Sequence, residues 1–116
     1  MVPRPGEIFW EYLRDDGPHP VVVVSREELN RGDYVVCVMF TSGKLETRRH
    51  LANCLPFRAG QYGLPKNCVA QSESITYIDK SYLDLETGPI GALDPEAMRD
   101  LTRAIGYVIS AECEPV

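Results

Sequence analysis

The side chains best suited to chemistry in this 116-residue chain are two histidines, four cysteines and a group of basic residues in the middle of the sequence. Histidine changes its charge near neutral pH, so His19 could carry a proton during catalysis. The cysteines stand at positions 37, 54, 68 and 113, and no two have the gap of about two to four residues found in zinc sites. Neither histidine completes a ligand pattern with them, so we expect no structural metal, no disulfide framework and no cofactor.

Charge is distributed unevenly along the chain. The whole sequence has 12 basic and 17 acidic residues, a formal net charge of −5, which argues against a general nucleic-acid binder. Residues 34–72 differ, because they contain five basic side chains and one acidic one. This segment could face an anion while the rest of the protein repels it, or it could be a solvated basic loop. Its basic residues are Lys44, Arg48, Arg49, Arg58 and Lys66.

The length and composition predict one globular domain spanning residues 1–116. Hydrophobic residues make up 44% of the chain and charged residues 25%, values close to the average of soluble proteins. No apolar run approaches the roughly 18 residues of a membrane span, so we expect no membrane association. Residues 1–6 lack the apolar stretch of a secretory signal, and a cytoplasmic protein with reduced cysteines is therefore expected.

Several short strands and one helix must position these side chains. Alternating or β-branched apolar residues predict strands at residues 7–13, 21–24 and 34–40, with Ile8, Trp10 and Tyr12 on the inner face of the first. The middle of the chain predicts a short strand at 50–55, a loop at 57–66, an extended segment at 68–77 and a helical turn at 78–81.

The clearest predicted element is a C-terminal helix. Asp94 is suited to cap it, Pro95 to its first position, and Glu96 to the positive end of its dipole. Strands followed by one helix predict an α+β domain built on a small, strongly bent barrel. The apolar stripe of the helix consists of Met98, Leu101, Ala104, Ile105, Val108 and Ile109.

Short motifs along residues 5–110 follow the order seen in one known family. They are Pro5–Ile8, Pro18–Ser25, Phe40–Ser42, Glu73–Ile75, Ile78–Leu83 and Ile90–Leu93. With the final helix, these motifs resemble the MazF/PemK toxins of bacterial type II toxin–antitoxin systems. The resemblance implies an SH3-like (MazF/PemK/CcdB-type) β-barrel with a C-terminal α-helix, and a homodimer. It also implies an endoribonuclease that cuts single-stranded RNA without metal and is inhibited by an antitoxin protein.

The resemblance also implies catalytic residues. Cleavage through the substrate's 2′-hydroxyl requires that a proton be removed, that charge on the phosphorane be stabilised, and that the leaving oxygen be protonated. The family uses an arginine before the proline of the second strand, and His19 stands at that position here. A histidine can accept or donate the proton, but it has neither the permanent charge nor the bidentate grip of arginine. Thr41 matches the family's hydroxyl residue, and Glu73 matches the acid that assists in some members.

The remaining expected contacts are with RNA. We expect Ser42, Lys44, Arg48, Arg49 and Arg58 to bind it, mainly at phosphates. Trp10, Phe57 and Tyr62 are possible stacking platforms for bases, although alternation with Ile8 favours a core position for Trp10. The alternative is a MazF-like dimer, weakened or inactive as a nuclease, that binds nucleic acid or an antitoxin-like peptide without cleavage.

Overall fold

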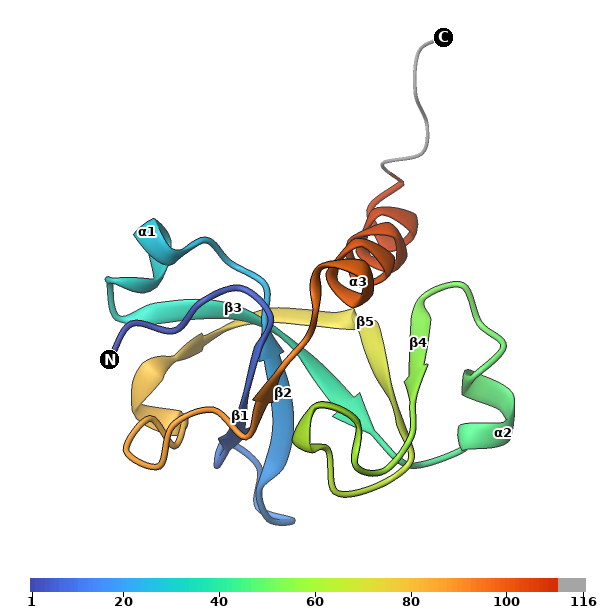
Figure 1. Cartoon of the computed structure of the whole chain (residues 1–116), viewed down its shortest axis with the longest axis horizontal. Coiled ribbons are helices and arrows are strands. Elements are labelled where there is room, and N and C mark those ends of the chain that lie inside the picture. Colours follow the sequence, from blue (N-terminus) through green and yellow to red (C-terminus); the bar gives the residue numbers. More distant parts are fainter. Residues whose placement is uncertain (111–116) are drawn as a thin grey trace, which may run out of the picture.

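A six-stranded antiparallel sheet forms most of the protein, and one helix packs against it (Figure 1). The computed structural model describes residues 1–110. The strands lie in the order β4-β5-β3-β2-β1-β6, so β4 and β6 are the two edges. The strands are β1 (Glu7–Glu11), β2 (His19–Val23), β3 (Tyr34–Thr41), β4 (Cys54–Phe57), β5 (Cys68–Asp79) and β6 (Gly91–Ala92).

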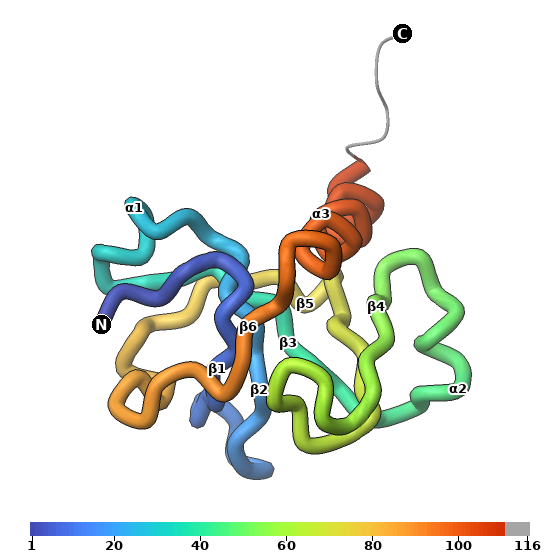
Figure 2. The backbone as a smooth tube through the Cα atoms, viewed as in Figure 1, coloured from blue at the N-terminus to red at the C-terminus, as the bar shows by residue number. Residues whose placement is uncertain are grey.

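Three helices and two 3-10 turns connect or cover the strands. The helices are α1 (Glu27–Asn30), α2 (Leu45–Arg48) and α3 (Pro95–Val108), and the turns are η1 (Gln61–Gly63) and η2 (Lys80–Tyr82). Figure 2 shows the strongly curled course of the backbone, with β6 beside β1 and α3 crossing near β5. The predicted α+β class, with a curled SH3-like sheet and a C-terminal helix, is confirmed.

Apolar residues are buried on both faces of the sheet. Successive side chains of a strand point to opposite faces, and here each face has its own core. Ile8 and Val22 belong to the cluster beneath α3, whereas their neighbours Phe9, Val21 and Val23 belong to a second cluster on the other face. The run of four valines at 21–24 therefore suits a strand with no solvent-facing side.

The helix α3 begins and packs largely as the sequence predicts. The Asp94 carboxylate accepts a hydrogen bond from the Ala97 amide at 2.8 Å, which satisfies one of the free N–H groups at the helix start. Leu101 is fully buried, and Met98 and Ile105 pack partly against the same cluster. Ile109 is exposed, so the predicted stripe is buried mainly in its first two turns.

Three sequence expectations were wrong in detail. The short strand predicted at 50–55 begins later, as β4, because α2 and its following turn occupy the preceding residues. Tyr12 is exposed instead of lying on an inner face with Ile8, because β1 ends at Glu11. The helical turn expected at 78–81 is η2, since β5 continues through Asp79.

Cys37, Cys54 and Cys68 are buried thiols. Burial, with a smaller effect of the Glu11 charge, raises the pKa of Cys37 to about 12, and burial raises the pKa of Cys68 to about 11. Cys113 lies outside the described residues. None of the helices within residues 1–110 has the length and apolar character required to cross a membrane.

Candidate active site

A pocket of about 370 Å³ opens where the loop between β1 and β2 meets the end of β3. Its polar lining comes from three segments that are far apart in the sequence. The sheet therefore gathers three of the predicted site residues, His19, Thr41 and Ser42, at one place. The polar and charged lining residues are Arg14, Asp16, His19, Thr41, Ser42 and Lys66.

Strand register explains why His19 and Thr41 meet. His19 is the first residue of β2 and lies opposite Glu11 of β1. Between β2 and β3 the paired residues end at Val21 and Met39, and His19 and Thr41 each lie two residues beyond that pair, at the same end of the sheet. Side chains two residues apart on a strand share a face, and both side chains line the same pocket.

The His19 ring lies between two carboxylates. Its Nδ1 is 3.4 Å from Glu11 Oε1, and its Nε2 is 3.5 Å from Asp16 Oδ2. The His19 side chain is 25% exposed, the Glu11 side chain is completely buried, and the Asp16 side chain is 72% exposed. One ring nitrogen therefore faces the protein interior, and the other faces the solvent side of the pocket.

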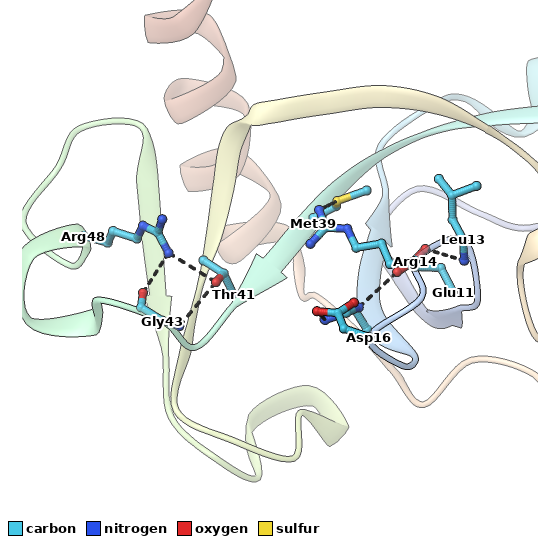
Figure 3. Close-up of polar contacts among 9 residues, drawn as sticks. Glu11, Leu13, Arg14, Asp16, Met39, Thr41, Gly43 and Arg48 are labelled. Carbon is cyan, nitrogen blue, oxygen red and sulfur yellow. Dashed lines mark hydrogen bonds and ion pairs between the residues drawn. The ribbon is translucent and has the colours of Figure 1, made fainter.

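Thr41 ends β3 with its hydroxyl oxygen accepting two hydrogen bonds. The donors are Arg48 Nη1 and the Gly43 amide, each 3.3 Å away, and Arg48 also donates to the Gly43 carbonyl at 2.8 Å (Figure 3). The bond from Gly43 is the local strand-ending bond expected of a threonine. Because the oxygen accepts both bonds, the hydroxyl proton of Thr41 is available for donation into the pocket.

Two cations of the pocket were not among the predicted site residues. Lys66 reaches it from the loop after η1, and Arg14 reaches it from the loop before His19. The Arg14 guanidinium donates to the Met39 sulfur, a weak acceptor, and forms no ion pair with a described carboxylate (Figure 3). Arg14 therefore brings a permanent positive charge to the pocket in which His19 lies.

Glu73 lies elsewhere. Its carboxylate accepts hydrogen bonds from Asn53 Nδ2 at 2.5 Å and Gln71 Nε2 at 2.8 Å. Partial burial acts to raise the Glu73 pKa, but these hydrogen bonds and the charge of Arg48 lower it overall. Within the described residues Glu73 neither lines the pocket nor contacts His19, and the two carboxylates at His19 come from Glu11 and Asp16.

Two of the three predicted RNA-binding arginines line a second pocket of about 440 Å³. Arg49 and Arg58 line it, together with Gln61, Asn67 and Cys68. Cys68 lines both pockets, so the two adjoin. Arg48 lines neither pocket but donates to Thr41 of the first one. Lys44 also lines neither pocket and directly precedes α2 in a left-handed conformation at φ 51°.

The aromatic residues considered for base stacking have different surroundings. Trp10 is half-buried and lines the first pocket instead of lying in the core. Phe57 is buried, with edge-to-face contacts to Phe40 and Tyr62. Trp10 is therefore the best placed of the three to meet a ligand near His19.

Residues 4–109 match a family model described as the PemK-like, MazF-like toxin of type II toxin–antitoxin systems. No curated protein sequence is significantly similar to the chain.

Solved structures share the whole fold. A toxin from Mycobacterium tuberculosis, MazF-mt6, superimposes with a TM-score of 0.74 and 24% identity, covering 90% of this chain and 96% of that one. A mycobacterial endoribonuclease in complex with its cognate antitoxin gives 0.73 and 23%, covering 93% and 95%. A MazE–MazF complex from Deinococcus radiodurans gives 0.72 and 13%, covering 94% and 96%. At these identities the likeness shows a common fold, the MazF fold.

Proposed function

Because the chain belongs to the PemK-like, MazF-like toxins of type II toxin–antitoxin systems, we propose that it is a metal-independent endoribonuclease that cleaves single-stranded RNA through the 2′-hydroxyl. The observation that carries this proposal is that His19 and Thr41 line one pocket with Arg14 and Lys66. Such cleavage requires proton transfer to and from the reacting oxygens and stabilisation of charge on the phosphorane, and these side chains are suited to both tasks.

In the proposed reaction the 2′-oxygen attacks the adjacent phosphorus, and the bond from phosphorus to the 5′-oxygen breaks. The products are a 2′,3′-cyclic phosphate and a 5′-hydroxyl. Neutral His19 can accept the 2′-hydroxyl proton, or the imidazolium can protonate the leaving 5′-oxygen, with water serving the other step. Arg14, Lys66 and the Thr41 hydroxyl are suited to stabilise charge on the non-bridging oxygens. The nucleophile belongs to the substrate, so the reaction requires no metal.

The second pocket adjoins the first, which supports a binding path for RNA that extends across both pockets. Arg49 and Arg58 can neutralise phosphates on one side of the cut, and Arg48 is bound to Thr41 at the first pocket. Ser42 lines the first pocket and can donate a hydrogen bond to the same RNA strand. Lys44 directly precedes α2 in this basic segment and adds to the positive potential. Each oxygen of the Glu73 carboxylate already accepts a hydrogen bond from a neighbouring side chain, which favours a structural role.

We propose two protein partners as well. Related structures contain an antitoxin, and an antitoxin-like peptide is accordingly the proposed inhibitor of this chain, acting in the cytoplasm. A homodimer is the proposed assembly. Sedimentation at micromolar concentration should give about twice the 13.0 kDa of the chain, and a monomer at every concentration would exclude a groove shared by two copies.

A second function follows from the residue at position 19. A histidine lacks the guanidinium group with which the family's arginine holds a phosphate through two hydrogen bonds. The arginines of the second pocket can bind nucleic acid whichever residue stands at position 19. The chain could therefore bind nucleic acid or an antitoxin-like peptide without cleavage.

Incubation of the purified protein with a long single-stranded RNA in EDTA tests the first function directly. We expect discrete fragments with 2′,3′-cyclic phosphate and 5′-hydroxyl ends, and a single 2′-deoxy substitution at the cut site should abolish that cut. Cleavage of the deoxy substrate, or dependence on Mg²⁺, would exclude the proposed chemistry. Salt-sensitive binding without fragments would favour the second function.

A further inference from the structure

The Glu11 carboxylate is completely buried at the end of β1, and one of its oxygens has no hydrogen-bond partner among residues 1–110. Glu11 Oε2 accepts from the Leu13 amide at 2.9 Å. Within the described residues Glu11 Oε1 and His19 Nδ1 are both buried polar atoms without a hydrogen-bond partner, and they lie 3.4 Å apart. A buried carboxylate oxygen is costly unless a donor faces it, and so is a buried ring nitrogen without a partner.

The other groups around Glu11 are poorly suited to donate a hydrogen bond to its Oε1 atom. Cys37 has a pKa of about 12, raised by burial and then by the Glu11 charge, so it is a neutral thiol and a weak donor. Asp16 is an acceptor that lies against the other nitrogen of the His19 ring. The Arg14 guanidinium is directed to the Met39 sulfur. The His19 Nδ1–H group is therefore the donor best placed for Oε1.

We infer that Glu11 is a positioning residue that fixes His19 as the tautomer carrying its proton on Nδ1, so that Nε2 is the atom that exchanges a proton with RNA. The inference rests on the proposed function for the RNA step only. The tautomer of a histidine is set by the hydrogen bond that its second nitrogen makes, and here the β1–β2 register sets that partner. Nε2 faces the solvent side, where the exposed Asp16 side chain can move away as a phosphate arrives.

The same arrangement gives His19 one property that an isolated histidine lacks. When Nε2 takes up a proton, the Nδ1–H group still faces the buried Glu11 carboxylate 3.4 Å away, which holds the ring in one orientation. The pair can therefore receive a proton at Nε2 and release it there without rotation of the ring. Glu11 acts through His19 and need not contact the substrate.

Nitrogen-15 NMR of the histidine rings tests the inference without RNA. The chain contains only His19 and His50, so a His50→Gln variant assigns the His19 signals. Above neutral pH, we expect Nδ1 of His19 to be the protonated nitrogen. His50 should instead resemble the free side chain, which favours Nε2–H. In Glu11→Gln the amide can donate to Nδ1, so the His19 proton should move to Nε2. Asp16→Asn, which changes the exposed partner, should leave the Nδ1–H form dominant.

Cleavage kinetics give the second readout. Glu11→Gln should lower kcat by about 10²-fold or more with little change in KM, because the wrong tautomer is presented to RNA. If the wild-type protein has its His19 proton on Nε2, or if Glu11→Gln leaves the tautomer unchanged, the inference is wrong whether or not RNA is cut. If Glu11→Gln does not fold, the wild-type spectrum alone decides. An inactive wild type with the Nδ1–H form would contradict the nuclease proposal and leave the Glu11–His19 pairing standing.

Discussion

Gly63 and Gly91 lie with their backbones in direct contact where η1 meets β6. An ideal Cβ on Gly63 would be 1.9 Å from the Ile90 carbonyl oxygen, and one on Gly91 would be 1.8 Å from the Tyr62 carbonyl oxygen. Real Cβ contacts are never that short, so neither position accepts a side chain without movement of the backbone. η1 follows β4, and β4 and β6 are the two edges of the sheet. The contact between these glycines therefore holds the η1 turn, which follows one edge strand, against the other edge strand.

Gly91→Ala should destabilise the fold strongly. Gly91 has an ordinary φ, so its substitution tests the lack of space alone, whereas Gly63 at φ 78° adds backbone strain. We expect a loss of at least about 1–3 kcal/mol in the free energy of unfolding, as for other overpacked sites. Gly32→Ala is the matched control, because its nearest neighbour is 3.6 Å away. Equal urea midpoints for the two variants would contradict the role of the glycine contact.

The Asp94 side chain makes the stability of the helix start dependent on pH. Its carboxylate accepts from the Ala97 amide and from the Tyr62 hydroxyl at 2.9 Å, and these bonds hold its pKa below the ordinary value of 3.8. A lowered pKa in the folded state means that the stabilisation is complete above the ordinary pKa and is lost as pH falls through the folded-state value.

Asp94→Asn keeps a capping side chain but removes the charge. We expect the wild type to have a Tm a few degrees higher than this variant at pH 7, and the difference to shrink below about pH 4. Asp94→Ala, which removes the cap, should remain less stable than Asp94→Asn at both pH values. A difference between wild type and Asp94→Asn that stays constant from pH 7 to pH 3 would contradict this account. Thermal unfolding followed by circular dichroism measures all three.

Elements with strong local signals could be predicted from the sequence. Asp94, Pro95 and the apolar spacing after them determine where α3 begins, and the valines at 21–24 lie in β2 or directly after it. The position of β4 could not be predicted, because α2 and the turn after it lack a long apolar repeat and form through local backbone hydrogen bonds. The contact between Gly63 and Gly91 joins segments that are far apart in the sequence and has no local signal.

The residues of the site could be predicted from the sequence only where a short motif identified the individual residue. His19 and Thr41 were identified from their motifs and meet in one pocket. Glu11 was missed because an acidic residue between apolar neighbours is typical of a solvent-facing strand position, whereas β1 is covered on both faces. Arg14 stands in a turn-rich loop, whose path across the pocket depends on tertiary packing. One indication of its role was present in the sequence, because Arg14 is the nearest arginine before His19, the position at which the family has an arginine.

Arg14 should contribute the permanent charge that His19 lacks. Arg14→Gln should reduce kcat/KM for RNA cleavage by about 10-fold or more, because a cation facing the phosphate is lost. Binding of a non-cleavable 2′-O-methyl RNA should weaken, and the slope of its salt dependence should decrease by about one ion. Arg14→Lys should keep much of the salt slope, since it keeps the charge.

Arg103→Gln provides the matched control for Arg14. Arg103 is an exposed arginine on α3 whose carboxylate neighbour is Asp100, at 3.2 Å, and it lines neither of the two pockets. Each variant removes one positive charge and makes the net charge of the chain more negative by one, so equal losses of affinity would show that Arg14 acts only through the overall charge. Fluorescence anisotropy at several salt concentrations separates the two cases.

The proposed role of His19 predicts a pH dependence that an arginine would not give. If the imidazolium is the general acid, cleavage should fall as pH rises. If the neutral ring is the base, cleavage should fall as pH decreases. His19→Ala should remove this limb of the pH–rate profile and lower the rate by about 10²–10⁴-fold, the usual contribution of a positioned acid or base. An unchanged rate and profile would rule out a catalytic role for His19.

His19→Arg distinguishes the two proposed functions. Arginine stays charged at any ordinary pH, so this variant should cleave with a flat profile if the pocket accommodates the longer side chain beside Glu11 and Asp16. Both carboxylates lie within 3.5 Å of the present ring and could form ion pairs with a guanidinium. Robust cleavage by His19→Arg together with none by the wild type would identify a binding protein that lost its chemistry at this position. If the wild type cleaves RNA with a pH-dependent limb in its pH–rate profile, and His19→Arg cleaves without that limb, His19 is identified as the proton-transferring group.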